Sequence, residues 1–99
     1  MPLEIRRSPS AEEDLVQIWI YTDEHWGEAQ ADDYLAAIEA SLLRVSEHPE
    51  IGADCSDVRE GYRRVSVGRH RVFYRLREDA VEVMRVLHTS VDVRSHLGD

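Results

Sequence analysis

The sequence predicts one domain of the α+β class: an N-terminal short strand and a two-helix antiparallel hairpin packed on a C-terminal antiparallel β-sheet. Apolar residues recur at helical spacing in the first half of the chain, whereas the second half alternates apolar and polar residues as strands do. The charge changes at the same place, because residues 1–58 hold 3 arginines and 14 acids whereas residues 59–99 hold 9 arginines and 6 acids. An acidic half and a basic half are typical of a protein that meets different partners on different faces.

Length and composition exclude several classes of protein. Ninety-nine residues suffice for one hydrophobic core, so we expect residues 1–99 to form a single domain without an interdomain cleft. No apolar run reaches the length of a membrane span, and the first ten residues lack the pattern of a signal peptide. We therefore expect a cytoplasmic protein without a membrane partner. The one cysteine, Cys55, has no partner for an internal disulfide and is interpreted as an inert packing residue.

The acidic half predicts a strand and a first helix. Residues 3–6 suit a short strand, and Ser10 with Glu13 forms a capping box at the start of a helix that Gly27 ends. The apolar stripe of this helix, which we expect to be buried, comprises Ala11, Leu15, Ile18, Trp19, Thr22 and Trp26.

A second helix follows Gly27 and ends before Pro49, which cannot continue a helix. Its stripe comprises Ala31, Tyr34, Leu35, Ile38, Leu42 and Val45. The two stripes predict an antiparallel hairpin. The acids of both helices then face solvent, away from any apolar pocket that could tune their pKa values, so catalysis by paired carboxylates is not expected.

The basic half predicts three antiparallel strands joined by tight turns at residues 68–69 and 78–79. Gly68 suits the first central position of a type II′ turn. Pairing outward from both turns places Val65 opposite Val72, Leu76 opposite Val81, Tyr74 opposite Val83 and Phe73 opposite Met84. The same register places Arg75 opposite Glu82, a favourable pair of charges across two strands.

This register assigns the side chains of the sheet to two faces. The face expected to pack on the helices comprises Val65, Val67, Val72, Tyr74, Leu76, Val81, Val83 and Leu87, with His70 as a structural histidine beside the turn. The opposite face comprises Tyr62, Arg64, Ser66, Arg71, Phe73, Arg75, Arg77, Met84, Val86 and His88. Because apolar residues lie among its arginines, we expect this second face to be open and to be covered by a partner.

A resemblance to a known family runs along nearly the whole chain. In the basic half it is carried by Gly61-Tyr62-Arg63-Arg64, Val67-Gly68-Arg69-His70-Arg71-Val72-Phe73-Tyr74-Arg75, Arg85-Val86-Leu87-His88 and Asp92. In the acidic half it is carried by Ser8-Pro9, Asp14-Leu15, Ile18-Trp19, Trp26-Gly27, Gln30-Ala31, Tyr34 and the Pro49, Ile51, Gly52 segment. In this order and spacing the segments resemble the ParE toxins of the RelE/ParE superfamily, which are the toxin half of type II toxin-antitoxin modules.

The resemblance implies a ParD-like antitoxin that wraps the toxin, DNA gyrase as the inhibited target, and a role in plasmid stabilization. One departure is the net charge of −8, since these toxins are commonly less acidic. Charge complementarity with an antitoxin then depends on the arginines of the open face. The residues expected to bind the antitoxin are Tyr62, Arg64, Arg71, Phe73, Arg75, Arg77, Met84 and Val86. Those expected to contact the target are His88, Arg94 and His96.

Two other functions stay open at this point. RelE relatives of the same fold cleave messenger RNA on the ribosome. Arg64, Arg71 and His88, which the register places on the same open face, would supply a pair of cations and one titrating group for that reaction. Those relatives tend to use lysines and a C-terminal tyrosine, whereas this chain has no lysine and no tyrosine after Tyr74. The third function is an inactive toxin-like binding module. We expect no catalytic residues, no metal, no cofactor and no direct nucleic-acid binding by the toxin alone.

Overall fold

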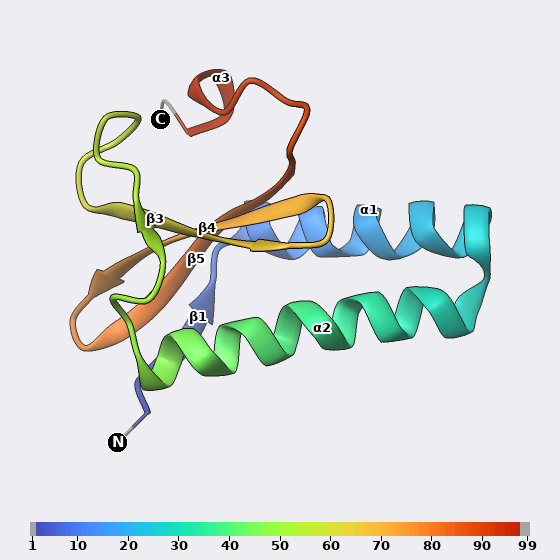
Figure 1. The fold of residues 1–99 in the computed structure, drawn as a ribbon, viewed down its shortest axis with the longest axis horizontal. Coiled ribbons are helices and arrows are strands. Elements are labelled where there is room, and N and C mark those ends of the chain that lie inside the picture. Colours follow the sequence, from blue (N-terminus) through green and yellow to red (C-terminus); the bar gives the residue numbers. More distant parts are fainter. Residues whose placement is uncertain (1, 98–99) are drawn as a thin grey trace.

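The structure, a computed structural model, describes residues 2–97 and consists of a helical hairpin on one face of a sheet and a short C-terminal helix on the other (Figure 1). No helix among the described residues is both long and apolar enough to cross a membrane. The elements in chain order are β1 (Glu4–Arg7), α1 (Pro9–Trp26), α2 (Glu28–Glu47), β2 (Ala53–Asp54), β3 (Tyr62–Val67), β4 (His70–Arg77), β5 (Ala80–His88) and α3 (Arg94–Leu97).

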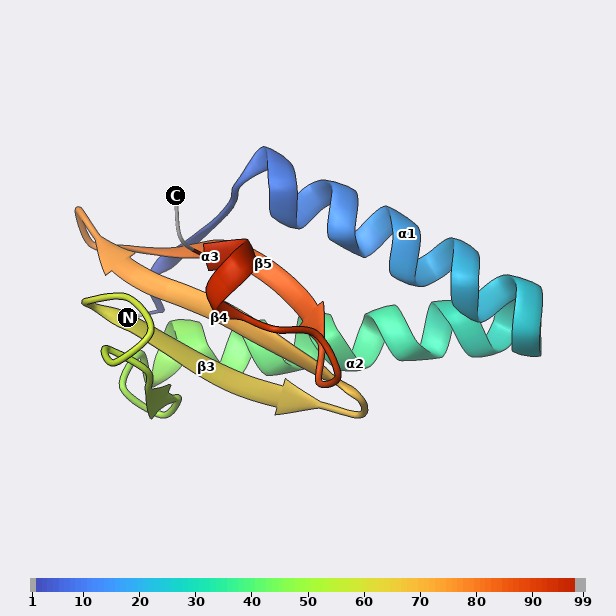
Figure 2. The same ribbon diagram turned by 90° about the horizontal axis from the view of Figure 1, so that it is seen from above.

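The predicted fold class is confirmed, and the sheet is mixed rather than wholly antiparallel. Its five strands lie in the order β1-β5-β4-β3-β2, with β1 parallel to β5 and all other pairs antiparallel. Seen from above, α1 lies along the β5 side and α2 crosses under β4 and β3 (Figure 2). The arrangement leaves the far ends of α1 and α2 projecting beyond the sheet (Figures 1 and 2).

Helix α1 begins two residues earlier than the capping box predicted. Ser8 is its N-cap, with Oγ accepting a hydrogen bond from the Ala11 amide at 3.0 Å, and Pro9 takes the first helical position, where its missing N–H costs nothing. Ser8 also reaches the sheet, because its Oγ donates to the Met84 carbonyl at 2.8 Å and its amide donates to the Val83 carbonyl at 2.9 Å. The cap therefore joins the start of α1 to the middle of β5.

The helices meet at Gly27, whose φ of +93° lets one helix end and the next begin without a loop. The prediction that both tryptophans are buried is wrong for Trp26, which is 65% exposed. Trp26 is the last residue of α1, and it therefore belongs to the end of the hairpin that projects beyond the sheet (Figure 1). Trp19 is half-buried, and its Nε1 donates to Asp32 on α2 at 2.9 Å.

The strand register is confirmed next to both turns. Val67 pairs with His70 and Arg77 with Ala80, and the φ of +55° at Gly68 agrees with the type II′ turn. The ladder between β4 and β5 then changes at a β-bulge between Phe73 and Tyr74. From the bulge onward each residue of β4 faces a residue of β5 one position later than predicted.

Because of the bulge, the predicted positions of four residues of β4 and β5 are wrong. Phe73 faces Arg85 instead of Met84, which becomes the extra residue of β5. Val86 pairs with Val72 and packs in the core under the helices, whereas Leu87 turns to the opposite face. His88 pairs with His70 instead of joining the arginine face.

One further expectation about the sheet fails without a change of register. Leu76 pairs with Val81 as predicted but is 44% exposed, because it lies near the turn at the end of the sheet.

Two hydrophobic clusters lie on the two sides of the sheet. The main core, between sheet and helices, comprises Ala11, Leu15, Ile18, Ile38, Leu42, Val45, Val72, Tyr74, Val81, Val83 and Val86. The second cluster comprises Cys55, Tyr62, Phe73, Leu87 and Leu97, with Val58, Met84 and Val93 packed at its edge. The expectation of an open second face is therefore wrong in part, since Tyr62 is 4% and Phe73 1% exposed beneath the chain's own C-terminal segment.

A carboxylate on α1 secures the bulge of β5. Asp14 receives two hydrogen bonds from the Arg85 guanidinium, at 2.7 and 2.9 Å, and a third from the Val86 amide at 2.9 Å. Both side chains are largely buried, at 14% exposed for Asp14 and 24% for Arg85. The expectation that the acids of both helices face solvent is therefore wrong for Asp14, because Arg85 of β5 neutralises its charge. A two-bond contact between a carboxylate and a guanidinium fixes geometry more strongly than a single bond. Asp14 and Ser8 thus bind the bulged segment from two points on α1.

We predict that Asp14→Asn lowers the free energy of unfolding by about 2–3 kcal/mol, because it leaves a partly buried guanidinium without its counter-charge. Urea denaturation followed by circular dichroism measures the loss. Glu4→Gln is the matched control, since it breaks an ion pair with Arg6 whose members are both exposed, and no measurable change is expected there. Equal stability of the two variants would contradict the anchoring role of Asp14.

Candidate functional site

The arginines predicted for antitoxin binding do share one face of the sheet. Arg64 faces Phe73 across the strands and Arg71 faces Ser66, so the two guanidinium side chains are diagonal neighbours. Neither Arg64, Arg71 nor Arg77 belongs to any ion pair among residues 2–97. Two adjacent, half-buried cations without acidic partners are an arrangement that favours an anionic group from outside.

The fourth arginine of this face already has a partner. Arg75 donates from Nε to Glu82 at 2.7 Å, as the predicted register required. This contact raises the pKa of the Arg75 guanidinium, which stays charged. We call Arg64, Arg71, Arg75 and Arg77 the arginine patch.

The apolar residues predicted beside these arginines are covered by the chain itself. Tyr62, Phe73 and Met84 belong to the second cluster beneath Leu97, and Val86 lies on the other side of the sheet. The C-terminal segment is held there by Arg59, which donates to the Leu97 carbonyl at 2.8 Å. The accessible part of the predicted site is therefore cationic rather than mixed.

The three residues considered for ribonuclease chemistry are not brought together. Arg64 and Arg71 lie on the face of the sheet opposite the helices, whereas His88 pairs with His70 on the helix side. The Nδ1 of His88 is 2.7 Å from Ser90 Oγ, a local contact in the turn after β5. General acid-base chemistry needs its groups within hydrogen-bond reach of one substrate, which this arrangement does not offer.

Two of the residues expected to meet the target lie on the C-terminal helix. Arg94 and His96 are exposed on α3, and Arg94 lies 3.8 Å from Asp57 in the loop before β3. Because α3 packs on the arginine side of the sheet, these residues are separated from His88 by the sheet itself. The residues predicted to contact the target therefore lie on opposite sides of the sheet.

The sequence reading missed a groove of about 950 Å³ between the helical hairpin and the sheet. It is lined by Asp14, Gln17, Ile18, Tyr21, Thr22, Trp26, Gln30, Tyr34, Gly68, Arg69, His70, Val86, Leu87, His88 and Ser90. Exposed aromatic rings stand at one end, where Tyr21 is 54% and Trp26 65% exposed. The signal in the sequence was the apolar stripe of α1, which continues past the last residue that the sheet can cover.

A hydrogen-bonded cluster forms the floor of this groove. The Tyr34 hydroxyl donates to the Val67 carbonyl at 3.0 Å, accepts from the Arg69 amide at 3.2 Å and lies 2.6 Å from His70 Nδ1. Since the hydroxyl has one proton and gives it to the carbonyl, His70 Nδ1 is assigned as the donor to Tyr34. His88 stands edge-on to His70, with ring centroids 5.3 Å apart. His70 is thus a satisfied structural histidine, as predicted.

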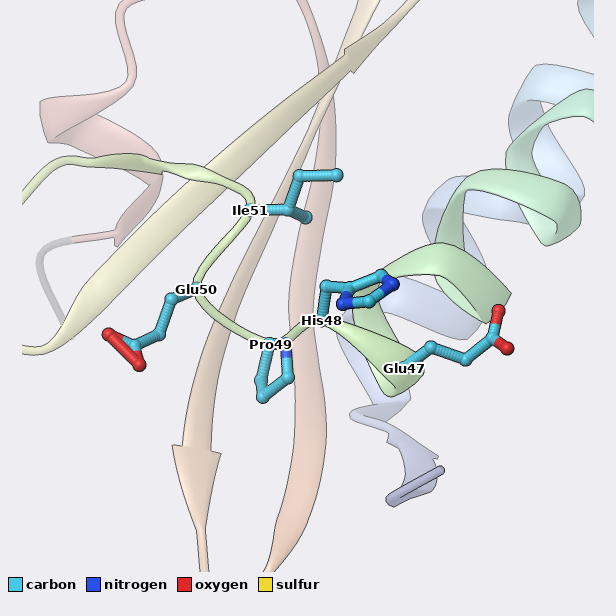
Figure 3. A pocket seen from close by; sticks show the side chains of 5 residues that line it. All are labelled: Glu47, His48, Pro49, Glu50 and Ile51. Atoms are coloured by element: carbon cyan, nitrogen blue, oxygen red, sulfur yellow. The ribbon is translucent and has the colours of Figure 1, made fainter. Parts of the chain in front are cut away.

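A second hollow, of about 510 Å³, lies where α2 ends and is lined by Glu47, His48, Pro49, Glu50 and Ile51. Figure 3 shows the two carboxylates pointing away from each other, so no polar groups converge on a ligand. Elsewhere in residues 2–97, no three side chains of the metal-binding types gather closely enough to hold an ion. The hollow at the end of α2 therefore offers no converging set of side chains for catalysis or metal binding.

Comparison with known sequences identifies one family. The family model described as the ParE toxin of the type II toxin-antitoxin system parDE matches residues 5–93. Toxin ParE1 of Caulobacter vibrioides is 44% identical over 93 residues, covering 94% of this chain and 96% of that toxin. Toxin ParE1 of Mycobacterium tuberculosis is 41% identical over 91 residues, covering 91% and 93%.

Solved structures share the fold at lower identity. The chromosomal ParDE toxin-antitoxin system of P. aeruginosa contains a chain with a TM-score of 0.76 at 15% identity, covering 87% of this chain and 95% of that one. A chain of the toxin-antitoxin complex RelBE2 from Mycobacterium tuberculosis has a TM-score of 0.64 at 22% identity, covering 89% and 99%. At these identities the likeness shows the fold alone.

We predict that His70 makes stability depend on pH. The pKa of His70 is lowered mainly by burial and further by the neighbouring His88, whereas the carboxylate of Asp14 acts in the opposite direction. The Tyr34 hydroxyl also contacts the His70 ring. Below the ordinary histidine pKa of about 6.5 the unfolded chain therefore binds more protons than the folded chain, so stability falls as the pH falls. Urea midpoints of His70→Gln should fall less between about pH 7 and 5 than those of the natural protein. His48→Gln, at an exposed position, is the control, and its urea midpoint should change with pH as that of the natural protein does. If the urea midpoint of His70→Gln also changes with pH as in the natural protein, His70 is not the group responsible.

Proposed function

The chain belongs to the ParE toxin family of type II toxin-antitoxin modules, and from this premise we propose that it inhibits DNA gyrase in the cytoplasm by binding and is neutralised by a ParD-like antitoxin. The match to the ParE family over residues 5–93 is the observation that carries the proposal. Such a module would serve plasmid stabilization. The toxin would act without covalent chemistry and without a cofactor.

The geometry supports action by binding. The candidate ribonuclease groups Arg64, Arg71 and His88 are divided between the two faces of the sheet. The chain also has no lysine and no tyrosine after Tyr74 with which to build a RelE-like site. What the molecule does present is an arginine patch and an apolar groove, which suit protein partners.

The arginine patch supports contact with an acidic segment of the antitoxin. Arginine holds a carboxylate through two parallel bonds, and Arg64 and Arg71 stand side by side without acidic partners among residues 2–97. Tyr62, Phe73 and Met84 would contribute by supporting the patch from beneath rather than by direct contact. Arg94 and His96 on α3, and separately His88, remain the residues proposed to meet gyrase.

A paired assay tests the proposed target. Purified toxin should inhibit supercoiling by DNA gyrase and should leave messenger RNA intact in a translating extract, because its arginines and His88 do not share a face. The toxin premixed with its antitoxin is the control and should spare gyrase. Codon-aligned cleavage of messenger RNA with gyrase unaffected would favour a ribonuclease. No effect in either assay would favour an inactive binding module.

We predict that Arg64→Glu combined with Arg71→Glu weakens antitoxin binding at least about a hundredfold, equivalent to roughly 2.7 kcal/mol, because charge reversal adds repulsion to the loss of the bonds. Titration calorimetry measures the affinity, and circular dichroism checks the fold. Arg6→Glu combined with Arg44→Glu changes the net charge equally on exposed positions outside the patch and should bind normally. Equal weakening by both pairs would mean that only the net charge matters.

A further inference from the structure

We propose that residues 92–97 form a strap that opens as a unit and so controls access to the apolar centre of the face that carries the arginine patch. In the closed position, which the structure shows, the strap follows β5 after a short turn and lies over the sheet on the side opposite α2 (Figures 1 and 2). The inference does not depend on the proposed function, because it concerns an equilibrium within the chain itself.

The strap buries one of its side chains in the second cluster. Leu97 is 4% exposed and lies on side chains from the sheet and from the loop before β3. The cluster around it comprises Cys55, Tyr62, Phe73 and Leu87, with Val93 of the strap at its edge. The strap is therefore a cover that lies across two other segments of the fold.

The covered side chains alternate with the arginine patch. Three of them, all on strands, lie directly opposite an arginine of the patch. These cross-strand pairs are Phe73 with Arg64, Tyr62 with Arg75, and Leu87 with Arg71. Directly opposite residues project from the same face of a sheet. With the strap closed this face is cationic, and with the strap open it offers apolar and cationic side chains together.

The strap contacts this face as a ligand would. Its apolar side chain, Leu97, enters the cluster, and the Leu97 carbonyl accepts a hydrogen bond from the Arg59 guanidinium at 2.8 Å. The same guanidinium lies 5.7 Å from the centre of the Tyr62 ring. A longer contact, of 3.5 Å, joins the Arg85 guanidinium to the His96 carbonyl. Both acceptors are neutral oxygens, which bind a guanidinium more weakly than a carboxylate does.

Few other contacts hold the strap closed. Among residues 2–97, no backbone–backbone hydrogen bond joins residues 92–97 to another segment. The remaining polar link joins Arg94 to Asp57 at 3.8 Å, and both side chains are exposed, so it contributes little. Helix α3 has four residues, too few for a helix that is stable alone. Because ordering the strap costs conformational entropy, its closed and open positions are close in free energy.

The buried thiol of Cys55 supplies the test, because it is the one cysteine of the chain and is 1% exposed within the covered cluster. The probe is iodoacetamide, and mass spectrometry measures the rate at which the folded protein is labelled. A local opening exposes little surface, so this rate should be almost independent of urea below the unfolding transition. A rate that rises with urea as steeply as global unfolding would overturn the proposal.

Two variants of the strap contacts should open it. Leu97→Ser removes the apolar anchor and should accelerate the labelling of Cys55 at least about tenfold. Arg59→Gln removes the charged donor to the strap and should accelerate labelling about threefold or more. Circular dichroism verifies that both variants fold.

Matched controls separate the strap from general destabilisation. Val91→Ser, at an exposed position that precedes the strap and lies outside the cluster, should be labelled at the natural rate. Arg44→Gln, at an exposed position on α2, should be labelled at the natural rate as well. If Leu97→Ser and Val91→Ser are labelled equally fast, Leu97 does not anchor a cover and the proposal fails.

Amide hydrogen exchange gives an independent readout. The amides of His96 and Leu97, which both donate to the Val93 carbonyl, should exchange through the same urea-independent opening. Amides in the middle of β4 should exchange only through global unfolding. If the strap amides exchange locally while Cys55 is labelled only on global unfolding, the strap moves without uncovering the cluster, which overturns the proposal. If Cys55 is labelled faster than the strap opens, the loop before β3 is the moving part instead, and the assignment to the strap is wrong.

Discussion

The fold depends on one irregularity in β5 and on the two side chains of the first helical segment that secure it. Ser8 binds the backbone of Val83 and Met84 immediately before the shift in register, while Asp14 binds Arg85 and the Val86 amide immediately after it. β1 pairs with β5 only as far as Val83, and these contacts supply partners for backbone groups of β5 at and beyond that point. The start of α1 and the middle of β5 are consequently locked in one relative position.

The bulge decides what each face of the sheet presents. Before it, β5 directs Val81 and Val83 at the helices; after it, Val86 takes that role and Leu87 turns to join the second cluster. The same shift brings His88 beside His70 at the groove and away from the arginines. The separation of His88 from the arginine patch therefore follows from the insertion of one residue.

Much of this architecture was accessible from sequence because it depends on local signals. Gly68 and the alternation around it sufficed to place the turn, the register of β3 against β4, and the common face of the arginines. The bulge was not accessible, since Met84 looks like any strand residue and the groups that stabilise the bulge lie more than seventy positions away. Periodicity likewise cannot report where a sheet ends, which is why Trp26 was expected to be buried. The cover over Phe73 was missed because a helix as short as α3 has no pattern of its own.

The most direct test of this account is the pairing of β4 with β5 in solution, measured by cross-strand nuclear Overhauser effects in the isotope-labelled protein. The bulged ladder predicts contacts between the backbones of Val72 and Val86 and between those of His70 and His88. A regular ladder continued from the Arg77 and Ala80 pair would instead bring Val72 opposite Arg85 and His70 opposite Leu87. Observation of that second set would contradict the assignment of both faces and of the groove between the hairpin and the sheet.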